Sequence, residues 1–267
     1  MTAEQTGNTR FRYREFPPAA PLANHVLTYW RFEASVPPGE TFTHHVWPDG
    51  CVSVNVVAAG GAAVAFSVTG PRLAPLEVPM VGDVVATGIR FWPDAGGAVL
   101  GTPAESLRDR WIDATELLGT EARTMAAMVA AEPDRAAMIF DDWVAARLRD
   151  ARPLDPVVRT AVRAIIATRG DRSIASLARD SGLGIRQLQR RFRRALGLSP
   201  KEYSRIRRLR STLEAALRGE ASWSAVAYEL GFADQSHLIH EVGDLTGLTP
   251  AAVRERLGLI EHVDVRA

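Results

Sequence analysis

Hydrophobic and polar positions change their spacing at about residue 100. Between Phe11 and Leu100 the apolar residues alternate with polar ones over short runs, most clearly in residues 51–57 (CVSVNVV). A period of two is typical of a strand with one buried face. From Pro103 onward the apolar residues recur every three or four positions, which is the period of a helix. The pattern therefore predicts a β front part followed by helices.

The predicted strands of the front part are short and separated by turn residues. Residues 58–63 (AAGGAA) form a turn between the strand at 51–57 and a returning strand at 64–70, which makes a hairpin. Residues 76–82 and 84–92 supply two more strands. Short strands at this spacing predict a small antiparallel sandwich or barrel.

The helical part begins within the front half of the chain. Ala104, Leu107 and Trp111 share one helical face, and residues 116–131 and 134–148 continue as helices. Residues 151–156 (ARPLDP) hold two prolines, which favours a domain boundary. The predicted fold class is α+β multidomain. A small antiparallel β barrel with following helices occupies residues 1–150, and an all-α domain occupies residues 151–267.

The all-α domain contains one motif twice. Gly182 and Gly231 stand 49 residues apart, and the tetrapeptides GLSP at 197–200 and GLTP at 247–250 stand 50 apart. Glycine in the left-handed conformation ends a helix sharply and allows a second helix to cross it. Two copies are too few for a solenoid and predict a pair of helix-turn-helix motifs. The two motifs span about residues 173–197 and 222–247.

The second helix of the first motif has an apolar and a polar stripe. The predicted core stripe consists of Ile185, Leu188, Phe192 and Leu196. The polar stripe consists of Arg186, Gln189, Arg190 and Arg193, spaced i, i+3, i+4 and i+7. Arginine pairs with guanine and glutamine with adenine in the major groove, so this face predicts a reader of double-stranded DNA. The alternative is a solvated helix face. The residues predicted to contact phosphate are Arg191, Arg193, Arg194, Arg205, Arg207 and Arg208.

The net charge of +1 conceals an uneven distribution. Residues 153–258 hold 18 basic against 11 acidic residues, whereas residues 1–152 hold 13 against 18. Within the all-α domain, residues 171–219 hold 13 basic against 4 acidic residues, and residues 220–258 hold 2 against 6. A basic domain favours nucleic acid as partner, and the first motif carries that charge.

These residues resemble the AraC/XylS family of transcriptional regulators. LARDSGLGIRQLQRRFRRALGLSPKEYSRIRRLR is similar to its first helix-turn-helix and linking helix, and VAYELGFADQSHLIHEVGDLTGLTP to its second. The resemblance covers about residues 173–257 and implies two readers in successive major grooves, with RNA polymerase as a further partner. The base readers that it implies are Arg186, Gln189 and Arg190, then Gln235, Ser236, His237 and His240.

The second motif departs from that family pattern. Leu238, His240, Val242 and Gly243 stand where the family usually has Phe, Arg, Phe and Lys. Because this motif is also acidic, we expect weak phosphate binding and a larger role in packing.

The front part resembles the cupin-like sensor domain of one branch of these regulators. The resemblance rests on YREFPPAAPLANHVLTYWRF, WPDG, VTGP and GIRFWPDAGGAVLG. It implies a small barrel through which a small ligand or a homodimer contact controls the protein. The candidate ligand-contacting residues are Trp30, His45, Trp47, Asn55, Arg90 and Trp92.

A metal site and a cofactor are not expected. His44 and His45 are adjacent, so they point to opposite faces of a strand, and no glutamate follows closely. Cys51 has no basic neighbour in sequence that would activate its thiol.

The predicted function is a sequence-specific DNA-binding transcriptional regulator, and catalysis is not expected because no triad, P-loop or nucleotide fingerprint is present. Two alternatives remain, a cupin-type metalloenzyme fused to a DNA-binding module and a regulator whose front domain binds another protein. No apolar run approaches the roughly 18 residues of a membrane span. The single cysteine and the polar N-terminus favour a cytoplasmic location.

Overall fold

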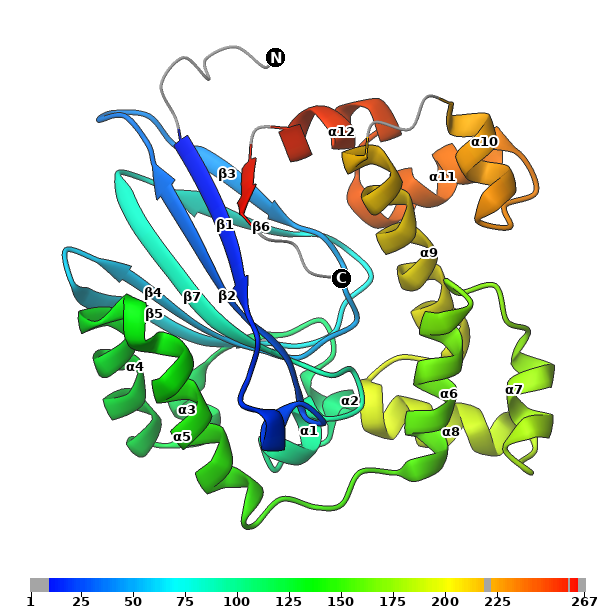
Figure 1. Cartoon of the computed structure of the whole chain (residues 1–267), viewed down its shortest axis with the longest axis horizontal. Helices are drawn as coiled ribbons and strands as arrows, with labels where there is room; N and C mark the ends of the chain where they lie inside the picture. Colours follow the sequence, from blue (N-terminus) through cyan, green and yellow to red (C-terminus); the bar gives the residue numbers. More distant parts are fainter. Residues whose placement is uncertain (1–9, 219–221, 259, 264–267) are drawn as a thin grey trace.

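The computed structural model describes residues 10–218, 222–258 and 260–263. Within these residues, a β-sheet with covering helices forms the front domain, and seven helices lie beside it (Figure 1). The strands are β1 (Arg10–Phe16), β2 (Val26–Ser35), β3 (Phe42–Val46), β4 (Ser53–Ala59), β5 (Ala62–Thr69), β6 (Leu76–Met80), β7 (Asp83–Phe91), β8 (Trp111–Asp113) and β9 (Ile260–Val263).

The helices follow in chain order. Those of the front domain are η1 (Ala20–Leu22), α1 (Gly96–Val99), α2 (Ala104–Leu107), α3 (Ala114–Leu118), α4 (Glu121–Ala131), η2 (Pro133–Arg135) and α5 (Ala136–Leu148). Those that follow are α6 (Pro156–Ala167), α7 (Ile174–Asp180), α8 (Ile185–Leu196), α9 (Pro200–Leu217), α10 (Trp223–Glu229), α11 (Gln235–Thr246) and α12 (Pro250–Gly258). The chain between α5 and α6 has no regular structure, and the division into domains at about residue 150 stays a prediction.

The front-domain sheet is open. Its strand order is β8-β5-β4-β7-β2-β1-β9, antiparallel except for the parallel pair β1 and β9, while β3 and β6 form a separate antiparallel pair. The prediction of an antiparallel β domain followed by helices is confirmed, but the closed barrel is wrong. Among the described residues, β8 and β9 form the two edges of this sheet. The sequence could not show this, because alternation along a strand does not specify which strands pair.

The two faces of the sheet bury different cores. On one face, Val54 and Ile89 pack with Phe140 of α5 in the cluster beneath α4 and α5, which cover that side in Figure 1. On the other face, Phe11 and Phe32 pack with residues of β3 and β6. The predicted hairpin is confirmed as β4 and β5, with Gly60 and Gly61 in the turn. The second face therefore lies between the main sheet and the β3–β6 pair.

Two details of the predicted pattern are wrong. Trp111 does not share a helical face with Ala104 and Leu107; it lies in β8 and is 52% exposed. The helix ends early because Arg108 is extended and Asp109 takes a left-handed conformation with φ 57°. Ile185 is 46% exposed rather than buried because it lies in the first turn of α8, one turn before the first buried position of that helix.

The internal repeat is visible in the helices. In the first copy α7, α8 and the start of α9 follow one another, and in the second α10, α11 and α12 do the same. Gly182 and Gly231 have φ of 63° and 69° at the turns, and Gly197 and Gly247 end the second helices with φ of 72° and 71°. Both third helices begin at a proline. The two copies therefore share their helix boundaries as well as their sequence pattern.

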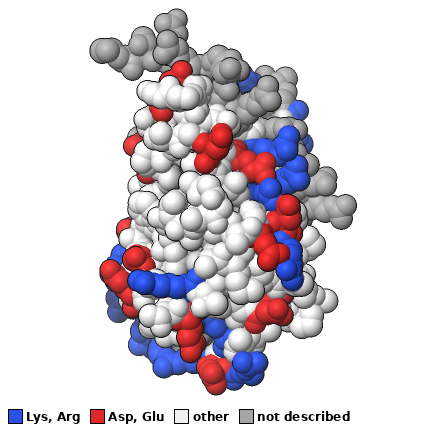
Figure 2. Space-filling view, turned by 90° about the vertical axis from the view of Figure 1, so that its left-hand side faces the viewer, with Lys and Arg blue, Asp and Glu red and all other residues white. Residues whose placement is uncertain are grey.

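Figure 2 shows the face of the molecule that lies on the left in Figure 1. Acidic and basic residues lie interspersed around a largely uncharged middle. This face of the front domain carries no patch of a single sign. The concentration of positive charge belongs instead to the helices of the first motif.

Candidate nucleic-acid interface

In the first motif, a small buried residue and a sharp turn allow α7 and α8 to pack closely. Ala178 on α7 is buried, and the chain reverses through Gly182 so that the Leu183 amide donates to the Ala178 carbonyl at 3.0 Å. Leu188 and Phe192 on α8 are fully buried in the core of this motif. The opposite side of α8 is thereby left facing solvent.

The predicted reader residues of α8 lie on that solvent side. Arg186, Arg190 and Arg193 are exposed and Gln189 is partly exposed. None of the four side chains forms a hydrogen bond or ion pair within the described part of the chain. Arg186 and Arg190 lie one helical turn apart on the same face. These cationic and amide groups are therefore available to a partner.

The predicted phosphate contacts differ from one another. Arg191 forms two bonds to Asp155, at 2.7 and 3.0 Å, and Arg205 pairs with Glu241 at 2.8 Å and Asp244 at 3.2 Å. Within the described residues, Arg193 and Arg194 are exposed and have no such partner. Arg207 and Arg208 are partly buried, and the guanidinium of Arg208 lies 5.6 Å from the centre of the Phe232 ring.

The second motif presents fewer cations. Gln235, Ser236 and His240 are exposed on α11. His237 is partly buried, because its Nδ1 accepts from the Ala233 amide at 3.2 Å and its ring meets the edge of a phenylalanine. Asp234 caps α11 by accepting from the His237 amide at 2.7 Å. His237 therefore supports the turn, whereas Gln235, Ser236 and His240 face outward.

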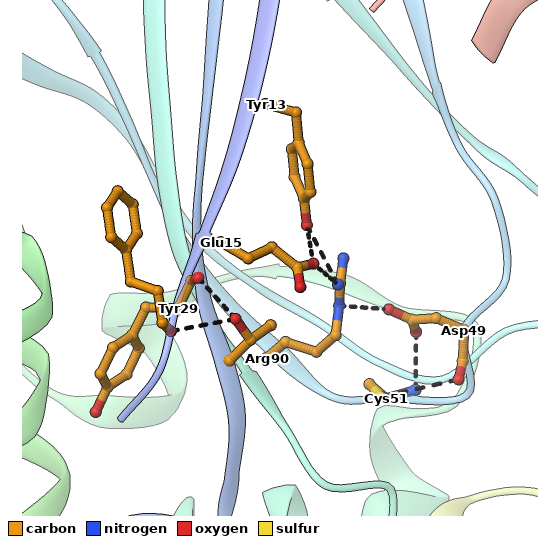
Figure 3. Close-up of polar contacts among 8 residues, drawn as sticks. Tyr13, Glu15, Tyr29, Asp49, Cys51 and Arg90 are labelled. Carbon is orange, nitrogen blue, oxygen red and sulfur yellow. Dashed lines mark hydrogen bonds and ion pairs between the residues drawn. The ribbon is translucent and has the colours of Figure 1, made fainter. Parts of the chain in front are cut away.

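Three of the candidate ligand residues lie on one face of the sheet. Gly88 pairs with Trp30 on one side and Asn55 on the other, and Arg90 lies two residues further along β7. Asn55 donates to Thr69 Oγ1 at 2.9 Å. Arg90 is surrounded by acceptors from other elements, as Figure 3 shows.

The contacts of Arg90 join the sheet to the turn after β3. Arg90 pairs with Glu15 at 3.1 Å and Asp49 at 2.8 Å and donates to the Tyr13 hydroxyl at 3.3 Å (Figure 3). Burial alone disfavours its charge, but the surrounding anionic groups outweigh burial and raise the pKa of Arg90. Burial also raises the pKa of Tyr13 to about 12. Arg90 therefore stays positively charged, and these contacts hold its guanidinium group in place.

The other three candidates lie elsewhere. The Trp92 indole donates to the Ala23 carbonyl at 2.9 Å, and Trp47 packs against the core of the second motif. His45 contacts Arg256 of α12 and Glu77. The six candidates thus do not form one pocket.

No group of three histidine, cysteine, aspartate or glutamate side chains that could hold a metal ion occurs in the described ranges. His44 stacks on Phe32 at 4.4 Å, and burial lowers the pKa of His44 to about 4. Burial raises the pKa of the Cys51 thiol, which keeps it protonated. Of the helices described, none is long and apolar enough to cross a membrane.

Comparison with known proteins gives one family match for each of the two parts of the chain. Residues 177–256 match a family described as a helix-turn-helix domain, and this domain is of the AraC type. The chain carries an AraC-type helix-turn-helix domain. Residues 14–113 match a domain family of unknown function, DUF6597. The AraC-type domain makes the chain a DNA-binding transcriptional regulator.

Similar solved structures include domains and whole chains, and no curated protein matches. The C-terminal domain of AraT, a response regulator from Geobacillus stearothermophilus, is 20% identical and covers 43% of this chain and 94% of its own, with a TM-score of 0.37. An apo variant of ToxT from Vibrio cholerae is 10% identical over 85% of this chain and 97% of its own, with a TM-score of 0.47. Wild-type ToxT with a bound unsaturated fatty acid is 11% identical over 95% and 97%, with a TM-score of 0.43.

The AraC-type domain is docked on the front domain through its linking helix. Tyr203 and Ile206 near the start of α9 are buried, and Gly50 lies so close that an added Cβ would be 2.9 Å from the Tyr203 ring. Asp49, which precedes Gly50, is the partner of Arg90. The turn at residues 47–50 therefore touches both the sheet interior and the helix that joins the two motifs.

Two polar contacts flank this dock. Arg108 donates to both carboxylate oxygens of Glu202, at 3.3 and 2.8 Å, and Glu202 forms a capping box with Ser199 at the start of α9. At the other end, Arg256 reaches His45 on β3. The sequence contains a signal for the capping box in Ser199-x-x-Glu202, but Arg108, Gly50 and Tyr203 have no local pattern that marks them as interface residues.

Proposed function

We propose that the protein reads DNA chiefly through α8, with Arg186, Gln189 and Arg190 contacting base edges and Arg193 contacting the phosphate backbone. The observation that carries this proposal is the contrast between the two reader helices. On α8, Arg186, Arg190 and Arg193 are exposed and their side chains are unpaired within the described chain, whereas Arg205 of α9, beside α11, is paired with Glu241 and Asp244. Free arginines supply most of the electrostatic part of DNA affinity.

The second motif serves mainly to orient the first. Gln235, Ser236 and His240 reach base edges from α11 with a smaller share of the affinity. His240 lies 3.9 Å from Asp244, so an acid also accompanies this residue. A phosphate that approaches α11 meets negative charge, which lowers the affinity of this half for DNA.

The proposal is tested by measuring the affinity of variants for a duplex that the wild-type protein selects from a random-sequence library. We expect Arg190→Ala to weaken binding by about 1–3 kcal/mol, the value of a lost bidentate contact, and His240→Ala to weaken it less. Arg123→Ala, which removes an exposed arginine from α4 of the front domain, is the matched control and leaves affinity unchanged. A larger loss for His240→Ala than for Arg190→Ala would contradict the proposal.

Control of DNA binding passes through the front domain. A small ligand or a homodimer contact that displaces the turn at residues 47–50 would shift α9, because Gly50 is packed against Tyr203. The polar face around Trp30, Asn55 and Arg90 connects to this turn through the Arg90–Asp49 ion pair. RNA polymerase is the further partner that the family resemblance implies.

A further inference from the structure

A cleft of about 440 Å³ separates the front domain from α8. One wall is formed by the segment from Asp94 to Ala104, which includes α1 and the first residue of α2, and the opposite wall by Arg191, Arg194 and Ala195. The linker at residues 152–155 closes one side. In Figure 1 α1 and α2 lie beside the end of α8. A cleft of this size between two domains is a common place for a small ligand.

The cleft wall on α8 is distinct from its reader face. Arg191, Arg194 and Ala195 are spaced i, i+3 and i+4, so they share one side of the helix. The reader residues begin at Arg186 and follow the same spacing on another side. The arginines that line the cleft and those of the reader face therefore lie on two different sides of one helix.

The charge inside the cleft is positive. Asp155 is paired with Arg191 and also caps α6, and Asp94 lies 3.4 Å from Arg159, which does not line the cleft. Both acids are thus compensated. Arg152 and Arg194 are exposed lining residues whose side chains form no hydrogen bond or ion pair within the described chain. Two uncompensated guanidinium groups remain.

The rest of the lining is largely apolar. Ala98, Pro103, Pro153, Leu154 and Ala195 contribute to it. An apolar wall beside free guanidinium groups suits an organic anion better than a simple inorganic ion.

We propose that this cleft binds a small organic anion, a carboxylate or a phosphate ester, whose charged group is held by Arg152 and Arg194. The occupant contacts α1–α2 and α8 at once and so stabilises the contact between the front domain and the first motif. Its effect on DNA binding rests on the proposed function of α8, whereas its binding to the cleft does not.

The test is a thermal unfolding series with benzoate and phenyl phosphate as probes, at constant ionic strength set with sodium chloride. We expect a probe to raise the midpoint of the wild-type protein by about 2–4 °C. Arg152→Gln and Arg194→Gln should remove most of this rise. Arg186→Gln and Arg193→Gln remove the same charge from α8 outside the cleft and should retain it.

Three results would overturn the proposal. The first is that neither probe stabilises the wild-type protein. The second is that the rise in midpoint persists in both cleft variants. The third is that Arg186→Gln removes the rise as fully as the cleft variants do, which would indicate general anion binding at the reader face. If Arg194→Gln instead weakens binding to a mixed-sequence duplex as much as Arg193→Gln and neither probe stabilises, the cleft arginine contacts the DNA backbone. The separate proposal that α8 contacts DNA bases is tested by the affinity of Arg190→Ala for the selected duplex.

Discussion

At the scale of single residues, the arginines of the AraC-type domain differ in whether their side chains form ion pairs within the protein. The side chains of Arg190 and Arg193 have no partner in the described chain, whereas Arg191 is held by Asp155 and Arg205 by two acids. A phosphate must displace a carboxylate from a paired arginine, so its net gain is small. The count of basic residues therefore overstates the number of contacts that DNA gains.

The pH dependence of the domain contact follows from Glu202. Burial works to raise its pKa, but the hydrogen bonds from Arg108 and Ser199 outweigh burial and lower the pKa of Glu202 to about 2. A carboxyl group with a lowered pKa in the folded state stabilises it above the ordinary pKa, and this contribution is lost as the pH falls toward the folded value.

We therefore expect wild-type protein to exceed Glu202→Gln in unfolding free energy at pH 7. The difference should shrink as the pH falls from about 4.5 to about 2, in urea unfolding series at several pH values. Glu229→Gln removes a carboxylate from an exposed pair with Arg169 and serves as control. A difference that stays constant across this pH range would contradict the assigned role of Glu202.

At the scale of elements, α9 belongs to the cores of both motifs and also contacts a turn of the front domain. Tyr203 and Ile206 pack with the first motif and the turn of the front domain, while Leu209 and Leu213 pack with the second motif. Because one rigid helix carries all of these contacts, the front domain is positioned to fix the orientation of both motifs.

The substitution Gly50→Ala tests this arrangement. Its φ of 75° disfavours a side chain, at a cost of roughly 1–2 kcal/mol, and the new Cβ would also press on the Tyr203 ring. Gly61→Ala is the matched control, because its φ of 79° brings the same strain with no atom within 4 Å. We expect only Gly50→Ala to increase hydrogen exchange of the first two turns of α9. Equal exchange in the two variants would mean that this contact does not hold the helix.

At the scale of the whole molecule, charge is divided between the two motifs. Residues 171–219 hold 13 basic against 4 acidic residues, and residues 220–258 hold 2 against 6. The acids Glu241 and Asp244 lie on the second reader helix and pair with Arg205 of the linking helix. The molecule thus presents one strongly cationic motif and one that is net acidic.

The double variant Glu241→Gln with Asp244→Asn should release Arg205. We expect tighter binding to a mixed-sequence duplex, and a plot of log affinity against log salt concentration that is steeper by about 1. Glu105→Gln with Glu116→Gln removes two exposed acids from the front domain and serves as control. If both double variants gain equally, net charge alone is responsible.

Local pattern was enough to predict most of the elements and much of the candidate reader face. The alternation of residues 51–57 predicted the β4–β5 hairpin, and the spacing of Leu188, Phe192 and Leu196 predicted the buried side of α8. Gly182 and Gly231 predicted the two turns because glycine adopts a positive φ without strain. These features depend on residues near one another in the chain, so the sequence alone determined them.

Only the tertiary structure decided which partners distant residues take. The main sheet is open while β3 and β6 pair with each other, and Arg205 is paired with acids 36 and 39 residues away. Arg152 and Arg194 come together because the linker and α8 border the same cleft. Pairing and charge compensation at such separations depend on the packing of whole elements, which no local period of the sequence encodes.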